Sequence, residues 1–249
     1  MTDLKKPENI LELIRFQKKL YKKYIRYLNQ LIKEKYKNAA LLTYWLNNYL
    51  NYLKAEHTFN PRFSINYKRG QIVYVNFGYR IGSELGGCHY AIVLDVKSSI
   101  KNSQVTVIPM KSKRFHETHY SRIYHVDLYE EIQLLLTEKS VGIIDNETKL
   151  VAQLVAQYGL EGIKNDAKIA KQVAESKRKL DHAQQIRLFA EEKLNHQSIA
   201  DVGQICTVSK IRIVHPTKKW DVLTNVCLSA GTMNRIEEKI KYLFLLSDN

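Results

Sequence analysis

Short runs of β-branched and aromatic residues in the middle of the chain constrain its fold most strongly. Three such runs occupy residues 71–77, 90–95 and 105–109, and the second is almost continuously apolar. Residues of these types favour strands, and polar or glycine-rich turns separate the runs. Strand-type sequence returns at residues 199–213 and 223–228. This pattern predicts a small β-barrel.

The first 58 residues have a different periodicity, which is typical of helices. Between residues 9 and 37, apolar side chains recur at steps of three, four or seven, with lysines largely between them. This spacing gives an amphipathic helix with one apolar face. A second helical pattern covers residues 39–53, and the Asn60-Pro61 step marks a linker. Residues 1–58 are therefore predicted to form a basic helical hairpin, with twelve Lys and Arg against five Asp and Glu.

Helix-type sequence also interrupts the strand pattern. Residues 130–136 and 147–158 are two helical candidates, and the second ends at Gly159. Residues 164–195 are rich in Ala, Lys, Glu and Gln and contain no Gly or Pro, so they are predicted to form one long helix. A terminal helix is expected to open near Thr232.

Together these segments predict an α+β chain in three parts. A basic N-terminal helical hairpin, residues 1–58, precedes a small barrel formed by residues 59–126 and 198–249. Residues 127–197 are expected to be a helical insertion between two barrel strands. An excursion of this length is large but tolerable, because the entropy of closing a loop grows only slowly with its length.

Charge is the strongest compositional signal. The formal net charge is +14 and the pI is near 9.5. Such a field attracts polyanions, of which nucleic acid is the common one in the cytosol. A soluble protein from a lysine-rich proteome would show the same balance. Sixteen tyrosines add aromatic faces on which unpaired bases can stack, although most are expected in the core or at its boundary.

The cysteines and the apolar runs indicate the compartment. Cys88, Cys206 and Cys227 are odd in number, far apart and without a Cys-x-x-Cys spacing. Neither a disulfide framework nor a structural zinc site is therefore expected, and free thiols suit a reducing cytoplasm. No apolar run is long enough to span a bilayer, and the N-terminus lacks an uninterrupted apolar stretch. We expect a cytoplasmic protein without a secretory signal or a membrane partner.

A glycine-rich stretch follows the first predicted strand. That strand opens with Lys68-Arg-Gly-Gln-Ile-Val-Tyr-Val75, and Gly82-Ser-Glu-Leu-Gly-Gly87 comes a few residues later. Glycines let a loop take positive φ and approach a ligand closely, but hairpin turns use them as well. The combination of this strand with this loop is much more specific than the glycines alone.

A second pair of motifs lies near the end of the chain. Gln204-Ile-Cys-Thr-Val-Ser-Lys-Ile-Arg-Ile213 has the character of a strand, and Leu228-Ser precedes the closing helix. With the first pair, these motifs resemble the MazF/PemK family of toxins. The resemblance covers about residues 66–126 and 198–246 and does not extend to the helical segments.

This resemblance implies an SH3-like barrel and a sequence-selective endoribonuclease that cuts single-stranded RNA without a metal or a cofactor. In that chemistry the ribose 2′-hydroxyl attacks the adjacent phosphate. One group takes its proton, another protonates the leaving oxygen, and donors stabilise the phosphorane. The resemblance also implies a growth-inhibiting toxin, a protein antitoxin as its partner, and a homodimer with the RNA groove at the dimer interface.

The family has a catalytic Arg two residues after the Gly-Gly pair and a Thr at the end of the next strand. Here these positions hold His89 and Lys111, and Ser112 is adjacent. A histidine with a pKa of about 6.5 can shuttle a proton, and an ammonium group can neutralise a phosphorane. These three residues are the candidate catalytic set. The alternatives are a partly buried structural histidine, a solvated lysine at a strand end and a serine that caps a turn.

Candidate RNA-binding residues surround the glycine-rich loop and the loop after the third strand. They are Arg69, Glu84, Gly86, Gly87, Arg114, His116 and Gln204. Glu84 can instead hold its loop, and Gln204 can serve strand pairing. His116 and His119 lie near His125, but no strong carboxylate or cysteine accompanies them at a recognisable spacing, so no metal site is predicted.

The replaced Arg and Thr also favour a function of a different class. A barrel that has lost cleavage could still bind nucleic acid or protein through its helices, whereas the retained glycine-rich loop favours the enzyme. For the N-terminal hairpin, an RNA clamp, a dimerisation arm and an autoinhibitory cover are all open.

Overall fold

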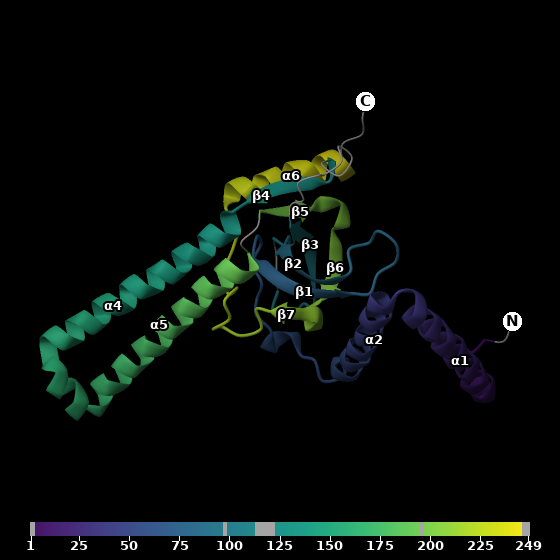
Figure 1. Ribbon diagram of the computed structural model, residues 1–249, viewed down its shortest axis with the longest axis horizontal. Helices are drawn as coiled ribbons and strands as arrows, with labels where there is room; N and C mark the ends of the chain where they lie inside the picture. The colour runs from purple at the N-terminus through teal and green to yellow at the C-terminus, as the bar shows by residue number, and fades with distance from the viewer. Residues whose placement is uncertain (1–2, 97–98, 113–122, 195–196, 246–249) are drawn as a thin grey trace. The chain divides into compact units, whose positions relative to one another are not determined.

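The computed structural model describes residues 3–96, 99–112, 123–194 and 197–245 (Figure 1). The chain separates into two units, Met1–His57 and Thr58–Asn249. Its secondary structure mixes helices with antiparallel strands, which confirms the predicted α+β class. Among the described helices, none is both long enough and apolar enough to cross a membrane.

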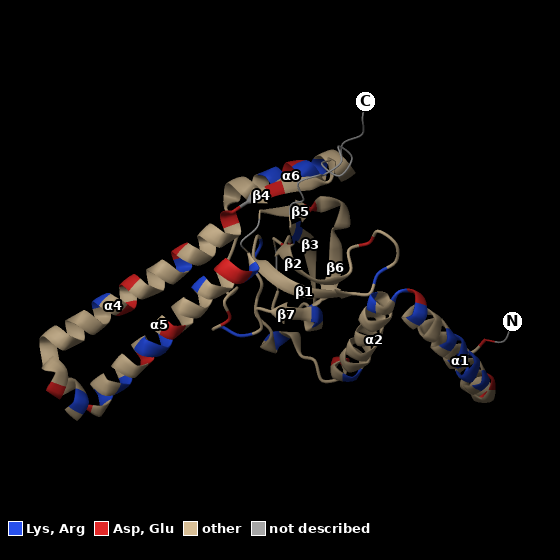
Figure 2. Cartoon of the chain, viewed as in Figure 1, with Lys and Arg blue, Asp and Glu red and all other residues tan. Residues whose placement is uncertain are grey.

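The first unit is a pair of helices joined at Lys35. A short 3-10 helix η1 (Pro7–Asn9) leads into α1 (Ile10–Glu34), and α2 (Tyr36–Glu56) begins directly after Lys35. The backbone of Lys35 leaves helical geometry, with φ −146° and ψ 64°. Both predicted helices are confirmed, with the break slightly earlier than expected. Lys and Arg are spaced along α1 (Figure 2), as the amphipathic pattern requires.

Among the described residues of the second unit, seven strands form a sheet. They are β1 (Ile72–Gly78), β2 (Gly87–Val93), β3 (Gln104–Ser112), β4 (His125–Tyr129), β5 (Ser198–Asp201), β6 (Cys206–Ser209) and β7 (Ile213–His215). Their order is β4-β5-β3-β2-β1-β7, with β6 paired to β3, and the pairings are antiparallel. The described strands thus form an open sheet, and the closed SH3-like barrel stays a prediction.

Strand β3 connects the different parts of this sheet. Its first residues, from Gln104 to Val107, pair with β6, whereas Met110 to Ser112 pair with Ser198 to Ala200 of β5. The middle of β3 pairs with β2. The end of β3 therefore lies directly beside a strand that comes about 90 residues later in the chain.

Two predicted boundaries in the sheet are wrong. Residues 127–129 belong to β4, although the sequence placed them in the helical segment. The strand expected over residues 199–213 is broken into β5, β6 and β7 by the 3-10 helices η3 (Val202–Gln204) and η4 (Lys210–Arg212). These short turns let consecutive strands pair with different partners, which the strand pattern alone does not reveal.

The strand predicted at residues 223–228 is also wrong. This segment contributes only an isolated bridge between Cys227 and Gln71. A turn hydrogen bond from Val226 N–H to the Leu223 carbonyl and a positive φ of 60° at Asn225 interrupt it. Its apolar residues are nevertheless buried, which accounts for its strand-like sequence.

Two long helices connect β4 to β5. They are α4 (Glu131–Asn165) and α5 (Ala167–Lys193), which pack against each other as a hairpin (Figure 1). α4 runs through both of the shorter predicted helices, and its backbone departs from helical geometry at Gly159 (φ 64°). The predicted helix at residues 164–195 corresponds to α5. Its N-terminus is capped by the Asp166 carboxylate, which accepts hydrogen bonds from two backbone N–H groups.

The last helix, α6 (Ala230–Phe244), begins two residues before the predicted Thr232. The Ser229 side chain caps it by accepting a hydrogen bond from the Thr232 N–H at 3.3 Å. Ile236 of α6 is fully buried in the hydrophobic cluster that also contains the inner ends of α4 and α5.

Both faces of the central strands are buried. Ile92 of β2 lies in the cluster formed with α4, α5 and α6. Its neighbours Ala91 and Val93 lie in a second cluster on the other face of the sheet. Successive side chains of a strand point to opposite faces, so a strand covered on both sides lacks a polar face. This explains the almost continuous apolar run at residues 90–95.

Candidate active site

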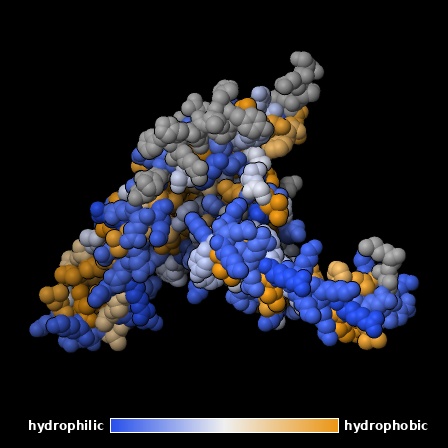
Figure 3. All heavy atoms as spheres, turned by 45° about the vertical axis from the view of Figure 1, so that its right-hand side comes forward, coloured by the Kyte–Doolittle hydropathy of each residue, from blue (hydrophilic) through white to orange (hydrophobic). Residues whose placement is uncertain are grey.

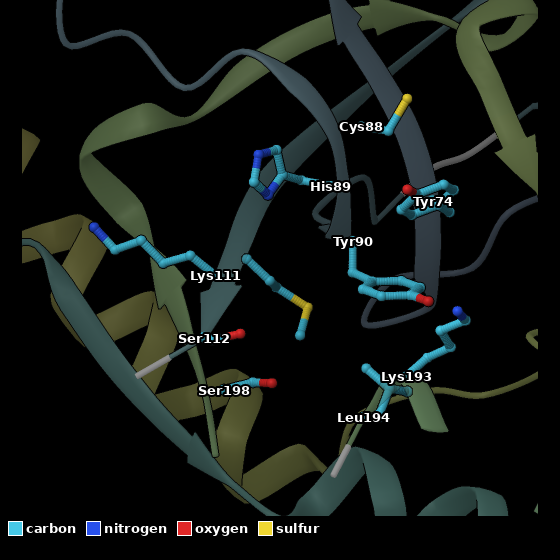
Figure 4. Close-up of a pocket in the computed structure, with 10 residues that line it drawn as sticks. Tyr74, Cys88, His89, Tyr90, Lys111, Ser112, Lys193, Leu194 and Ser198 are labelled. Carbon is cyan, nitrogen blue, oxygen red and sulfur yellow. The ribbon is translucent and has the colours of Figure 1, made fainter. Parts of the chain in front are cut away.

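A pocket of about 250 Å³ opens where β1, β2, β3 and β5 meet the end of α5. The residues that line it are Tyr74, Cys88, His89, Tyr90, Met110, Lys111, Ser112, Lys193, Leu194 and Ser198 (Figure 4). All three candidate catalytic residues line this pocket, but the side chains of Lys111 and Ser112, neighbours on β3, point in different directions (Figure 4).

His89 lies on β2 and is half-buried. Its Nε2 lies 3.0 Å from the carbonyl oxygen of Gly86, and because a carbonyl only accepts, this nitrogen carries the proton in that contact. Burial lowers the pKa of His89 below its ordinary value of 6.5, although hydrogen bonds to the backbone of Gly86 and Met110 act in the opposite direction. The imidazole is therefore neutral at pH 7, the state that accepts a proton.

Lys111 is held at the wall of the pocket by an ion pair. Its Nζ lies 3.0 Å from Oδ2 of Asp201, and the same oxygen lies 3.7 Å from Nε2 of His125. The Asp201 side chain is 11% exposed, and a carboxylate at that depth needs a charged or hydrogen-bonding partner. Lys111 is thus not a freely solvated lysine, because β5 fixes the position of its ammonium group.

Ser112 and Ser198 are direct cross-strand partners on β3 and β5. Directly opposed residues of an antiparallel pair present their side chains on the same face of the sheet. Both serines line the pocket, and their hydroxyl groups point in the same direction (Figure 4). Ser112 is therefore the last residue of β3 and lies at the cavity.

Aromatic rings form another wall of the pocket. The rings of Tyr74 and Tyr90 lie 4.8 Å apart between centroids, and Phe189 of α5 meets the Tyr90 ring edge-on at 6.3 Å. Burial, with a smaller contribution from Tyr74, raises the pKa of Tyr90 to about 12. Tyr90 therefore remains a neutral phenol at pH 7, with an apolar face on which a base could stack.

The glycine-rich segment leads directly into β2. A Cβ added to Gly86 would lie 2.8 Å from the carbonyl oxygen of Gly78, closer than real Cβ atoms approach. Gly87 has a φ of +86° and lies at an irregularity in the pairing of β1 with β2. Both positions require glycine, and this backbone path places the Gly86 carbonyl against His89.

The glycine-rich loop, His89 and the end of β3 lie in one continuous segment of the chain. Residues 68–145 match the family of PemK-like, MazF-like toxins of type II toxin–antitoxin systems. The match confirms the family resemblance for the first pair of motifs, and it does not reach the motifs after residue 198. No curated protein shows a significant match to the chain.

Two predicted RNA-binding residues support the loop of this MazF-like segment. The Gln204 Oε1 accepts a hydrogen bond from the Leu85 N–H at 3.3 Å, and its Nε2 lies 3.5 Å from the Ser83 carbonyl oxygen. Glu84 lies 3.7 Å from the guanidinium of Arg80. Glu84 and Gln204 line a separate cavity of about 170 Å³. The structure therefore places them beside the loop and outside the pocket that contains His89.

Arg69, another predicted RNA-binding residue, does not line the pocket either. Arg69 donates hydrogen bonds to the Leu94 carbonyl and to the Glu237 carboxylate, and so joins the sheet to α6. Arg114 and His116 lie outside the described residues. Within the described part of the chain, no group of three or more His, Cys, Asp and Glu side chains is placed to hold a metal ion.

Sequence reasoning missed the contributions of β5 and α5 to the pocket. Asp201 reaches Lys111 across 90 positions of sequence, and Ser198 reaches Ser112 through the same strand pairing. Predicting the partner of the 110–112 segment would have found both residues, but the strand pattern specifies strands and not their partners. Lys193 comes from a helix whose sequence has no feature that distinguishes it from a solvated basic helix.

Proposed function

We propose that Thr58–Asn249 is a metal-independent, sequence-selective endoribonuclease that cleaves single-stranded RNA, and that the chain acts as the toxin of a toxin–antitoxin pair. One observation supports this proposal. His89, Lys111 and Ser112 all belong to the segment that matches the toxin family, and all three line the same pocket. In this proposal residues 59–126 and 198–249 close into an SH3-like barrel, and residues 127–197 are an insertion. Two copies form a homodimer, and a protein antitoxin neutralises it.

His89 is the proton acceptor in this mechanism. The ribose 2′-hydroxyl gives its proton to the neutral imidazole while the 2′-oxygen forms a bond to phosphorus. The bond between phosphorus and the 5′-oxygen then breaks, leaving a 2′,3′-cyclic phosphate on one product and a 5′-hydroxyl on the other. No redox step or co-reactant is needed, because the proton released at one oxygen is balanced by protonation of the other.

Lys111 supplies the positive charge. Its ammonium group, oriented by Asp201, neutralises the phosphorane and protonates the leaving 5′-oxygen. The contact with Asp201 holds the ammonium group in one position, so the charge is in place before the reaction. Tyr90 offers its face to a neighbouring base.

Incubation of the purified protein with a long single-stranded RNA in EDTA tests the proposal. We expect cleavage, and we expect His89→Ala to lower its rate by about 10²- to 10⁴-fold, the usual effect of removing a general base. His57→Ala, which changes an exposed histidine of the first unit, is the control and should cleave at the parent rate. Activity that is lost in EDTA and restored by Mg²⁺ or Zn²⁺ would contradict the mechanism, as would an unchanged rate for His89→Ala.

The pH dependence of cleavage provides a further check on His89. Because burial lowers its pKa, the ring stays neutral down to a pH below 6.5, and the rate should fall only as the pH drops through that lowered pKa. His89→Arg restores the family residue and should remove this acid limb, since an arginine does not titrate there. If the rate of His89→Arg falls at low pH in the same way as that of the parent protein, the fall is caused by the protonation of a group other than His89.

One observation favours a second candidate function. The positions of the family Arg and Thr hold His89 and Lys111, and the charge of Lys111 is already paired with Asp201. A domain with these replacements could bind RNA or protein without cleaving. RNA binding without cleavage by either the parent protein or His89→Arg would favour this function over the enzyme.

A further inference from the structure

The pocket is completed by residues from outside the family segment. The toxin-family match ends at residue 145, yet Lys193, Leu194 and Ser198 line the pocket beside His89. Lys193 is the last residue of α5, and Ser198 is the first residue of β5. The end of α5 and the start of β5 therefore both lie at the cavity.

The end of α5 is fixed in place by packing. Leu194 and Ala190 belong to the main hydrophobic cluster, and Ile186 one turn earlier is fully buried. Phe189 makes the edge-on contact with Tyr90 in the pocket wall. The backbone of Lys193 is held by these neighbours, while its own side chain is exposed. A lysine placed in this way can reach a ligand without disturbing the fold.

The charges around the pocket leave Lys193 uncompensated. Lys111 is paired with Asp201, whereas Lys193 makes no ion pair or hydrogen bond with another described residue. No Asp or Glu occurs among the described residues that line the pocket. Lys193 is therefore the pocket cation that is not neutralised by the described part of the protein.

Two serine hydroxyl groups also line the part of the cavity that Lys193 borders. Ser112 and Ser198 project side by side, toward the part of the pocket that Tyr90 and Lys193 border (Figure 4). Neither hydroxyl makes a hydrogen bond to another described residue. One ammonium group and two hydroxyls provide several donors around one space, and a phosphate offers acceptor oxygens with negative charge.

We infer that Lys193, Ser198 and Ser112 form a phosphate subsite that holds a backbone phosphate of single-stranded RNA next to the bond that is cleaved. The inference rests on the proposed ribonuclease function for its ligand, but its binding test does not require cleavage. It gives the α4–α5 hairpin a direct role, because the hairpin carries the cation of the subsite.

The test measures the affinity of the full chain for a short single-stranded RNA in which deoxyribose replaces the ribose at the cleaved position. Lys193→Gln should weaken binding about tenfold or more, as expected for the loss of a charge-assisted contact to phosphate. It should also reduce the dependence of log affinity on log salt by about 0.7, the contribution of one phosphate contact in a single strand. Ser198→Ala should weaken binding a few-fold, and Lys193→Arg should retain most of the affinity.

Lys177→Gln is the matched control, because Lys177 is an exposed lysine of α5 that does not line the pocket. Parent-like affinity and salt slope for Lys193→Gln would overturn the subsite, as would equal losses for both lysine variants. A parent protein that binds inorganic phosphate but no RNA would also overturn it. If the parent binds the analogue, depends on Lys193 and yet cleaves no natural RNA, the subsite stands and the ribonuclease proposal fails.

Discussion

Both helical pairs of this chain carry helix-type sequence, but they pack very differently. The α4–α5 pair inserts Leu136, Ile186 and Ala190 into the core beside the sheet. The α1–α2 pair buries only Leu31 and Ala39 among its described apolar residues, and side chains such as Phe16 remain exposed. Figure 3 shows such apolar surface at the lower right, where α1 and α2 lie. A helical pattern in the sequence therefore predicts that a helix forms, but it does not show how much of that helix the fold buries.

Polar contacts also join α4 to α5. Within the α4–α5 hairpin, the Ser140 hydroxyl donates to the Ala183 carbonyl at 2.9 Å, and Lys179 lies 2.9 Å from Glu147. These contacts join one helix to the other along their length. They fix the direction in which α5 returns to the sheet, and so the position of Lys193.

The largest effect should come from shortening a core residue of α4. Leu136 is fully buried, so Leu136→Ala should reduce the free energy of unfolding of the second unit by about 2–5 kcal/mol. Leu134→Ala is the control on the same helix, because that side chain is 58% exposed, and its effect should be within about 0.5 kcal/mol. Urea unfolding followed by circular dichroism measures both. Equal effects would show that α4 is not part of the core.

Removal of the first unit should leave the second folded. Residues 58–249 contain both hydrophobic clusters, so they should unfold at the same urea concentration as they do in the full chain. If α1 and α2 act as an RNA clamp, the shortened protein should bind single-stranded RNA more weakly, with a salt slope shallower by about 0.7 for each lost phosphate contact. An unchanged slope would point to dimerisation or to a cover. Loss of the folded state would show that the first unit supports the sheet.

The smallest effect should come from the ion pair inside the α4–α5 hairpin. Hydrogen bonds from Lys179 and Ser176 hold the pKa of Glu147 below its ordinary value. A carboxyl with a lowered pKa in the folded state contributes stability above its unfolded pKa of about 4.5, and loses it as the pH falls through the folded value. Glu147→Gln should remove this acid dependence and cost less than about 1 kcal/mol at pH 7, because Lys179 is partly exposed to solvent.

Glu161→Gln is the control for this pH experiment, since Glu161 is an exposed carboxylate of the same helix. It should leave the acid limb of the stability curve unchanged. A stability curve for Glu147→Gln that falls with acid as steeply as that of the parent would show that the pair with Lys179 does not couple protonation to folding.

The sequence by itself determined the local elements and the family segment. The glycines at positions 86 and 87 are required by a close backbone approach and a positive φ, and such requirements are visible in a motif. Helical periodicity located α1, α2 and α5, and β-branched runs located β1, β2 and β3. These features depend on neighbours a few residues apart, so a single sequence contains them.

Only the tertiary structure decided which distant residues meet at the pocket. The pairing of β3 with β5 brings Asp201 to Lys111 and Ser198 to Ser112. The packing of α5 against the core places Lys193 at the pocket. The contact of Arg69 with Glu237 of α6 likewise joins positions far apart in the sequence. Strand pairing and helix packing are set by burial across the whole unit, and the local periodicity of a sequence does not specify the partner that covers each face.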